Sequence, residues 1–359
     1  MKLVLGTRSS KLAIAQTNIF LNGYKNICNW YAEEGRKFID VDFEIKKFVT
    51  QGDKYSKEGK VRFDKINFVS DIEKALLAKE IDIAVHSAKD MPAKPDPRFE
   101  VKYFAEDEYF AEDDKLIINS NRDLYIFRDE IDISKITKIG EPYDLSGLRV
   151  GTSSLRRKMQ AKFFYRADNV LDIRGNVDTR MQKLSDNQFD CIILAEQGLR
   201  RLGIYKNDLN CVVSSNLPAM GQGIVCLQYR AEDEKTGKII STIFDNNNLL
   251  DGNINAFIEM AEAQQFVSAL GADCNSAIAI QVDDATDWGN CRGLMLQAEI
   301  YGKDSFIRVA SHDENGDILK KEYATMKEYP HAGEHEVITN ILIKEAIEKG
   351  ALDLLNEHN

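Results

Sequence analysis

Hydrophobic and polar positions in the first two-thirds of the chain predict strands and helices that alternate. Short apolar runs predict strands at residues 2–5, 41–49, 81–85, 148–150, 170–173 and 189–194. Stretches with apolar residues on one side predict helices after Ser9 or Ser10, at 68–78, from Leu155, after Asn176 to about Leu184, and up to Leu202. This alternation is typical of α/β lobes with largely parallel sheets.

The last part of the chain has a different pattern. Residues 278–282, 293–301, 306–311 and 318–323 alternate apolar and polar positions as antiparallel strands do, with Asn315-Gly316 as a turn. Residues 336–349 predict a closing helix. We therefore expect a small α+β domain here, whereas residues 112–146 are charged and irregular and indicate an insertion.

Composition and charge limit the classes of function. The 359 residues are enough for two or three domains, and 43% hydrophobic with 29% charged residues is typical of a globular protein. No apolar run of about 18 residues predicts a membrane span, and the first residues lack the pattern of a secretory signal. The net charge of −11 is unfavourable for general binding of nucleic acid or anionic membranes. An anionic ligand would therefore need a local basic cluster.

Cysteine and histidine usage indicates reduced thiols rather than a metal centre. The six cysteines are scattered without a C-x-x-C pair, as in proteins of a cytosolic-type compartment. His331 and His335 could share a helix face beside Glu334, but Pro330 and Gly333 interrupt that stretch. No metal site is predicted.

Cationic and hydroxyl side chains gather where predicted strands meet helices. They are Arg8, Ser9, Ser10, Ser153, Ser154, Arg156, Arg157, Arg174, Asn176 and Arg180, with Arg200 and Arg201 at a helix end. In an open α/β sheet, ligands bind at the carboxyl ends of strands, where free N–H groups and the helix dipole favour anions. In an acidic protein this pattern predicts a polyanionic ligand in a cleft, although surface pairing of the arginines with carboxylates explains it equally well. No P-loop and no G-x-G-x-x-G after a strand is present, which argues against a nucleotide cradle.

Five short motifs resemble, in order, those of the hydroxymethylbilane synthase (porphobilinogen deaminase) family. His86–Pro92 resembles the H-S-x-K-D-x-P loop, Gly151–Arg157 the G-T-S-S-L-R-R element and Arg174–Arg180 the R-G-N-V-x-T-R element. Leu194–Gly203 and Pro218–Gly223 resemble I-L-A-x-x-G-L-x-R-L-G and P-A-x-G-Q-G. Each motif alone is weak, but five collinear ones are highly specific.

The resemblance implies a transferase that condenses four porphobilinogen molecules head to tail and releases ammonia at each addition. The pyrrole chain grows on a dipyrromethane primer, one per protein chain, which a thioether joins to a cysteine. Each ring carries an acetate and a propionate, so the enzyme must hold many carboxylates at once. This requirement accounts for the number of arginines at the predicted strand ends.

The resemblance also implies an architecture and a setting. It implies two α/β lobes of the type II periplasmic-binding-protein kind around a cleft, plus a small α+β C-terminal domain. We expect domain 1 at residues 1–110 and 219–243, domain 2 at 111–218 and domain 3 at 244–359. The expected protein is a monomer with no nucleic-acid or membrane partner. Its expected location is the cytoplasm, or an organelle stroma if a transit peptide has been removed.

Asp90 is expected to be the catalytic residue. A carboxylate near the pyrrole N–H would stabilise the positive charge that develops as ammonia leaves, and would relay protons. Lys89 beside it favours the ionised carboxylate. From the residues alone, an Asp in such a loop more often satisfies backbone N–H groups of a turn, and the resemblance reverses that preference.

Cys274 is expected to carry the dipyrromethane, because a thiolate is the nucleophile that an electrophilic pyrrole carbon requires. By composition alone it does not differ from an inert structural thiol. The remaining positions that match the family's cofactor- and substrate-binding residues are Arg8, Ser10, Lys65, Lys89, Thr152, Ser153, Ser154, Arg156, Arg157, Arg174, Gly175, Asn176, Arg180, Arg201 and Gln222.

Two segments depart from the family pattern. Around Cys274 the family has L-E-G-G-C-x-V-P-I, but here Gly271–Asp273 replaces E-G-G and Ala277 stands at the proline position. The family's G-G-K-G-L-F-V-K element becomes Phe63–Ser70, which keeps Lys65. Two other hypotheses stay open. Two α/β lobes around an anion-binding cleft also describe an organic-anion binding protein of the periplasmic type, and the altered cysteine loop suggests a family member that folds but cannot assemble its primer.

Overall fold

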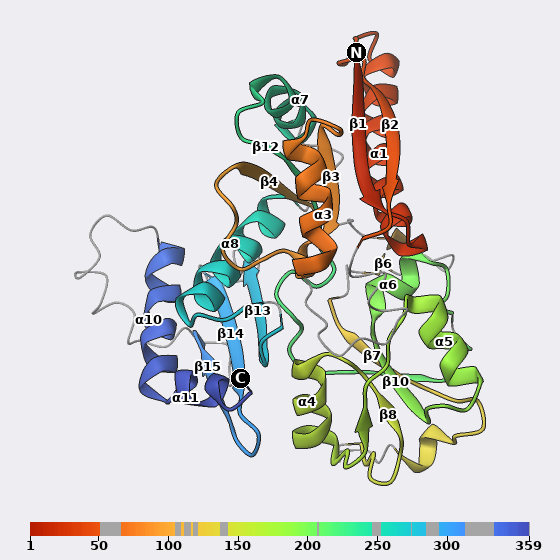
Figure 1. Ribbon diagram of the computed structural model, residues 1–359, viewed down its shortest axis with the longest axis vertical. Coiled ribbons are helices and arrows are strands. Elements are labelled where there is room, and N and C mark those ends of the chain that lie inside the picture. The colour runs from red at the N-terminus through yellow and green to blue at the C-terminus, as the bar shows by residue number, and fades with distance from the viewer. Residues whose placement is uncertain are drawn as a thin grey trace.

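The computed structural model describes residues 1–50, 66–104, 109–110, 116–117, 121–136, 143–206, 208–245, 253–273, 275–284, 294–312 and 334–358. These residues form three units, each built around its own sheet (Figure 1). Lys65, Cys274 and the strand predicted at 318–323 lie outside the described residues. Of the helices in the described ranges, none combines the length and apolarity that crossing a membrane requires.

The first unit contains a five-stranded sheet in the order β2-β1-β3-β12-β4. Its strands are β1 (Lys2–Arg8), β2 (Asp42–Phe48), β3 (Ile83–Ser87), β4 (Phe99–Phe104) and β12 (Val225–Arg230). Its helices are α1 (Lys11–Glu33), α3 (Ile66–Leu77) and α7 (Glu234–Asp245). Successive strand residues point to opposite faces. Leu3 and Leu5 of β1 therefore join the cluster of α1 and α7, while Val4 packs with α3 on the other face.

The second unit contains a sheet in the order β11-β7-β10-β8-β9. Its strands are β7 (Asp123–Phe127), β8 (Val150–Gly151), β9 (Val170–Leu171), β10 (Cys191–Ala195) and β11 (Cys211–Val213). Helix α4 (Leu155–Tyr165) packs on one face, and α5 (Val177–Ser185) and α6 (Glu196–Arg201) pack on the other. Two short elements precede α4, the pair β5 (Tyr109–Phe110) and β6 (Leu116–Ile117) and the turn η2 (Ile133–Lys135).

Strand β7 shows that the prediction of an irregular insertion at 112–146 was wrong. It lies between β10 and β11 and is antiparallel to both, and all five of its residues are buried. A strand buried on both faces has no apolar–polar alternation. The charged residues on either side of β7 also made this stretch resemble a loop. The prediction of largely parallel sheets was also wrong, because each of these two sheets has two parallel and two antiparallel pairings among the described strands.

The third unit is the expected α+β domain. Strands β13 (Ile278–Asp284), β14 (Leu294–Tyr301) and β15 (Phe306–Ala310) form an antiparallel sheet, and α8 (Asn253–Ala269), α10 (Glu334–Glu348) and α11 (Ala351–Asn356) pack with it.

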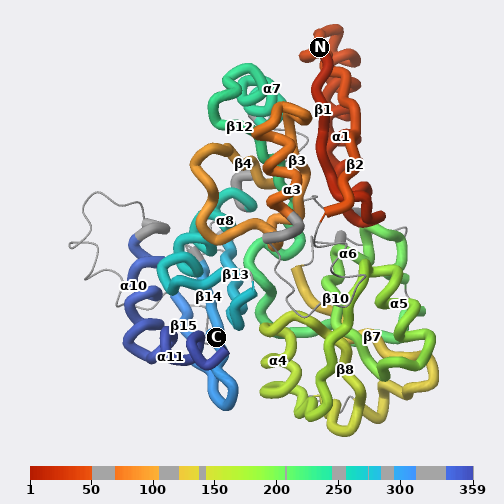
Figure 2. The backbone as a smooth tube through the Cα atoms, viewed as in Figure 1, coloured from red at the N-terminus to blue at the C-terminus, as the bar shows by residue number. Residues whose placement is uncertain are grey.

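The third unit lies beside both of the others (Figure 2) and shares a hydrophobic cluster with each. Residues of α8 share one hydrophobic cluster with Tyr103 and Met91 of the first unit. On the other side, Tyr301 and Phe306 pack against Phe163 and other residues of α4. The chain thus holds its two α/β units against a common third one.

Candidate active site

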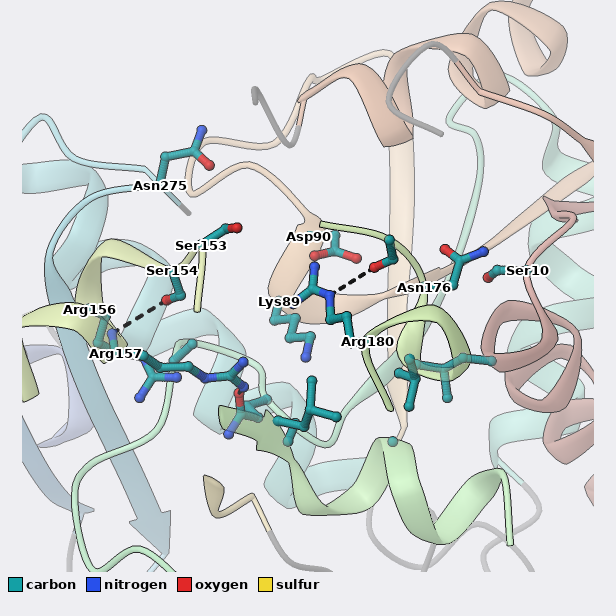
Figure 3. Close-up of a pocket in the computed structure, with 18 of the residues that line it drawn as sticks. Ser10, Lys89, Asp90, Ser153, Ser154, Arg156, Arg157, Asn176, Arg180 and Asn275 are labelled. Atoms are coloured by element: carbon teal, nitrogen blue, oxygen red, sulfur yellow. Dashed lines mark hydrogen bonds between the residues drawn. The ribbon is translucent and has the colours of Figure 1, made fainter. Parts of the chain in front are cut away.

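A cavity of about 370 Å³ lies where strand ends of the first two units face each other (Figure 3). Its walls come mainly from segments that follow β1, β3, β8, β9 and β10. The third unit adds Asn275, Ser276 and Ile278. This is the place where open α/β sheets bind ligands, and the volume is in the usual range for small-molecule sites.

The cavity brings together most of the binding residues expected from the sequence. Those in its wall are Arg8, Ser10, Lys89, Asp90, Ser153, Ser154, Arg156, Arg157, Gly175, Asn176, Arg180 and Gln222. Thr152, Arg174 and Arg201 are described but are not part of the wall. Thr152 is buried and accepts a hydrogen bond from the Ser154 N–H at 3.2 Å, and Arg201 donates to the Gly223 carbonyl at 2.6 Å.

The loop that carries Asp90 begins directly at the end of β3. Residues Ala88–Asp90 form a single 3-10 turn, η1, within this loop. The Ala88 N–H donates to the Ile224 carbonyl at 3.0 Å, which ties the turn to the segment before β12. In Figure 3 the side chains of Lys89 and Asp90 lie in the cavity close to Arg180. The Asp90 carboxylate therefore lies among cationic side chains.

Two helices begin at the cavity with serine caps. Ser10 accepts a hydrogen bond from the Ala13 N–H at 3.3 Å at the start of α1, and Ser154 accepts one from the Arg157 N–H at 3.5 Å at the start of α4. Each hydroxyl uses an oxygen lone pair for the cap, so its hydrogen stays able to donate to an anion. The helix dipoles add positive potential at the same places.

Arg156 and Arg157 share one buried carboxylate, that of Asp123 at the start of β7. Arg156 Nη1 lies 2.8 Å from Asp123 Oδ2, and Arg157 Nη2 lies 2.7 Å from Asp123 Oδ1. The three residues are 3%, 8% and 4% exposed. Burial alone would raise the pKa of Asp123, but the two guanidinium groups outweigh it and hold that pKa well below the usual range. Both arginines are thus partly committed to the fold.

Further donors of these arginines bind backbone and amide groups. Arg156 donates to the Leu217 carbonyl at 3.1 Å, and Arg157 to the Ile193 carbonyl at 3.0 Å. Gln222, 2% exposed, donates to Asp123 Oδ1 at 2.8 Å and accepts from Arg157 at 3.3 Å. Gln222 therefore joins the segment before β12 to the strand β7.

Arg180 differs from this pair. Its Nε donates to the Gly175 carbonyl at 2.8 Å, and no ion pair with a carboxylate is found for it in the described part of the chain. Burial, together with the nearby Arg157 and Arg8 guanidinium groups, lowers the pKa of Arg180 to about 10, and Asp90 opposes this shift. Arg180 stays charged at neutral pH, in a region where its two guanidinium neighbours and burial outweigh the effect of the Asp90 carboxylate on its pKa.

Gly175 has a backbone conformation that other residues rarely adopt, with φ of +113°. A Cβ atom there would lie 2.7 Å from the Thr179 side chain. This glycine therefore lets the chain turn tightly from β9 into α5 and places Asn176 and Arg180 at the cavity.

Three features of the site were not identified from the sequence. Asp123 lay in the stretch interpreted as an insertion, although the apolar run that follows it could have revealed a strand. Lys11 and Asp178 line the cavity and form an exposed ion pair of 3.4 Å between α1 and α5. A contact between residues so far apart in sequence leaves no local signal.

Comparisons with known proteins give one consistent result. The sequence model of a family described as "Porphobilinogen deaminase, dipyromethane cofactor binding domain" matches residues 3–238. Porphobilinogen deaminase from Paenibacillus macerans is 34% identical over 284 residues, 77% of this chain and 76% of that protein. Porphobilinogen deaminase from Oceanobacillus iheyensis is 35% identical over 252 residues, 68% of this chain and 71% of that protein.

Among solved structures, the chain is similar to an arginine periplasmic binding protein from Legionella pneumophila. The TM-score is 0.38 at 12% identity, with 73% of this chain and 99% of that chain covered.

Proposed function

This chain belongs to the porphobilinogen deaminase family, and from that premise we propose how its cavity performs the family reaction. The chain is a transferase of tetrapyrrole biosynthesis with hydroxymethylbilane synthase activity. It condenses four porphobilinogen molecules head to tail, with release of ammonia, and uses a dipyrromethane cofactor. The proposal concerns which side chains hold these molecules and which one carries the chemistry.

The donor groups of the cavity fit a dipyrromethane, whose rings carry acetate and propionate groups. Arg8 and Arg180 supply guanidinium groups, and Ser10 and Ser154 supply hydroxyl groups, from different sides of the cavity. Such dispersed cations suit several separate carboxylates better than one phosphate chain. When bound, the cofactor supplies the pyrrole carbon to which the next ring is joined.

We assign the attachment point to Cys274, which lies outside the described residues. Its neighbours in sequence, Asn275 and Ser276, line the same cavity as Asp90. The Asp273 carboxylate accepts a hydrogen bond from the Asn275 N–H at 2.7 Å, which shapes this turn without the family's two glycines. The placement of these neighbours supports an attachment within reach of the cavity.

Asp90 is assigned as the catalytic carboxylate, and one observation carries this assignment. The acidic residues among the described ones that line the cavity are Asp90 and Asp178. Asp178 is paired with Lys11 at the rim, whereas Asp90 lies among cations in the interior. An ionised carboxylate there can stabilise positive charge on a pyrrole nitrogen as ammonia leaves, and can accept its proton.

The arginines have two roles in this proposal. Arg8 and Arg180 hold ligand carboxylates, because positive charge is crowded around them. Arg156 and Arg157 contribute part of the wall, and their main contacts hold Asp123 and Gln222 in place.

We further propose three domains, residues 1–110 with 219–243, residues 111–218 and residues 244–359. The return of β12 to the first sheet and the separate third sheet support this division. We also propose that the protein acts as a monomer. Four described cysteines, Cys28, Cys191, Cys211 and Cys226, are free thiols, which supports a reducing compartment such as the cytoplasm.

The test uses two matched substitutions, Asp90→Asn and Asp178→Asn. Each removes one cavity carboxylate and keeps its size. Loss of a general acid–base group typically costs about 10²–10⁴-fold in turnover, so we expect such a loss for Asp90→Asn and at most a few-fold change for Asp178→Asn. Ammonia release from porphobilinogen measures turnover, and the two variants are compared with wild type.

Intact-protein mass spectrometry completes the test. Wild type should be heavier than the bare chain by two linked pyrrole units, and Cys274→Ser should lose that mass. An unmodified wild-type mass after incubation with porphobilinogen, with no ammonia released, would overturn the proposed function. Equal turnover of Asp90→Asn and wild type would remove Asp90 from its role.

A further inference from the structure

The loop that carries Asp90 has little regular structure of its own and is packed against the third unit. After η1, Met91 and Ala93 are 1% and 4% exposed. They belong to one hydrophobic cluster with Met260 and Ala263 of α8. Helix α8, which is more than 160 residues away in sequence, therefore helps to hold this loop in place.

Gly221 shows how close this packing is. A Cβ atom at Gly221 would lie 2.6 Å from the Met260 sulfur and 3.0 Å from the Ala88 Cβ. The segment before β12, the start of the Asp90 loop and α8 thus meet at one point. A small movement of α8 would be transmitted to the loop, because close-packed interiors are stiff.

One polar side chain of α8 reaches the loop directly. Gln264 is 9% exposed, and its Nε2 donates to the Pro92 carbonyl at 3.3 Å and to the Tyr103 hydroxyl oxygen at 3.1 Å. Pro92 is two residues after Asp90, and Tyr103 lies on β4 of the first sheet. The two N–H bonds of one amide therefore tie the end of the Asp90 loop to the sheet.

We infer that Gln264 is a positioning residue that fixes the Asp90 loop for catalysis, so that the third unit sets the geometry of the reacting carboxylate. This inference rests on the proposed function of Asp90. Its physical basis is the Pro92 carbonyl, which loses a buried donor when the amide is removed. A misplacement of about 1 Å at a catalytic group can cost up to about 10²-fold in rate.

The chain provides a matched control next to Gln264. Gln265 is the following residue on α8, and its Nε2 donates to Asn340 Oδ1 on α10 at 3.1 Å. Gln265 is partly buried and belongs to the same helix, but its side chain contacts α10 instead of the Asp90 loop. Loss of its hydrogen bond should affect the stability of that unit without acting on the Asp90 loop.

The experiment compares Gln264→Met and Gln265→Met in the full-length, cofactor-loaded enzyme. Methionine keeps the length of the side chain and removes the amide. Intact mass reports cofactor loading, thermal unfolding reports stability, and ammonia release at varied porphobilinogen concentration gives kcat and KM. We expect kcat of Gln264→Met to fall roughly 10-fold with KM changed less than about threefold, and kcat of Gln265→Met to stay within about twofold. Both variants should carry the cofactor mass and have similar Tm values.

Two outcomes would overturn the inference. In the first, Gln264→Met keeps the kcat of wild type. In the second, both variants lose kcat in parallel with Tm, which would assign Gln264 a structural role only. If Gln264→Met does not fold, Gln264→Leu removes the same donor to Pro92 and is judged by the same criteria. A wild type that releases no ammonia would instead contradict the proposed function itself, which keeps the two failures apart.

Discussion

Arginines at neighbouring strand ends of the second unit are used in two different ways. Arg156 and Arg157, which follow β8, are almost fully buried and share the Asp123 carboxylate. Arg180, which follows β9, lies near other guanidinium groups, and its pKa is lowered to about 10, mainly by burial. The same residue type in the same kind of turn therefore serves folding where another strand supplies a carboxylate. We propose that it serves ligand binding at Arg180, for which the described residues supply no ion pair with a carboxylate.

The largest expected effect comes from removal of the shared carboxylate. Asp123→Asn would leave two buried guanidinium groups without their counter-charge, and breaking such a pair typically costs about 3–5 kcal/mol. We expect the free energy of unfolding in urea to fall by roughly that amount. The control is Asp190→Asn, since Asp190 also accepts from two arginines, Arg128 and Arg149, but in a more solvated place. A loss for Asp123→Asn no larger than for Asp190→Asn would contradict the comparison.

The second effect is on binding rather than stability. Arg180→Gln removes a charge that no carboxylate in the described residues neutralises by an ion pair, so the free energy of unfolding should not fall. A hydrogen bond to a charged group contributes about 1.5–3 kcal/mol, so KM for porphobilinogen should rise by about 10-fold or more. Arg156→Gln is the contrast, because it should lower stability. Steady-state kinetics measure KM, and urea unfolding measures the free energy of unfolding, for both variants.

The third effect is the pH dependence of the same residue. The pKa of Arg180 in the folded chain, about 10, is below its ordinary value of 12.5, so the unfolded chain holds this proton more tightly between these pH values. The charge of Arg180 therefore opposes folding below about pH 10, and anion binding should weaken as pH rises through that value. KM of wild type should rise between pH 9 and 10.5 and approach that of Arg180→Gln. Parallel KM profiles of the two proteins would show that another group titrates.

The smallest effect is expected at the rim. Lys11 and Asp178 have side chains that are 75% and 47% exposed, and exposed ion pairs contribute about 0–1 kcal/mol. Lys11→Ala should change the free energy of unfolding by less than about 1 kcal/mol, and added salt should remove even that difference. A large loss that persists in high salt would show that this contact holds the first two units together.

Much of the fold follows from local pattern. Strands β1, β2 and β3 and the helices between them lie close to the residues that the apolar pattern predicts. Ser10 and Ser154 cap α1 and α4 as their positions suggest. Strand β7 was missed because burial on both faces removes the alternation that marks a strand.

The candidate site was also only partly predictable. Asp90, Arg8 and Arg180 line one cavity as the family match implied. The parallel strands β1 and β3 bring Arg8 and the Asp90 loop to one sheet edge, and the edge of the second sheet that carries Arg180 faces it. Asp123 and Gln264 could not be found in this way, since their partners are more than 30 and more than 160 residues away. No local sequence rule encodes such contacts.

The sequence by itself determined the family, the alternating strands and helices that begin each of the two α/β units, and the supply of cations at strand ends. These depend on short-range rules, namely residue periodicity, capping and motif spacing. Only the tertiary structure decided which arginines meet a carboxylate and which face the cavity, and which helix supports the Asp90 loop. The physical reason is that ion pairing and close packing depend on distances between distant segments, and these are set when the three units assemble.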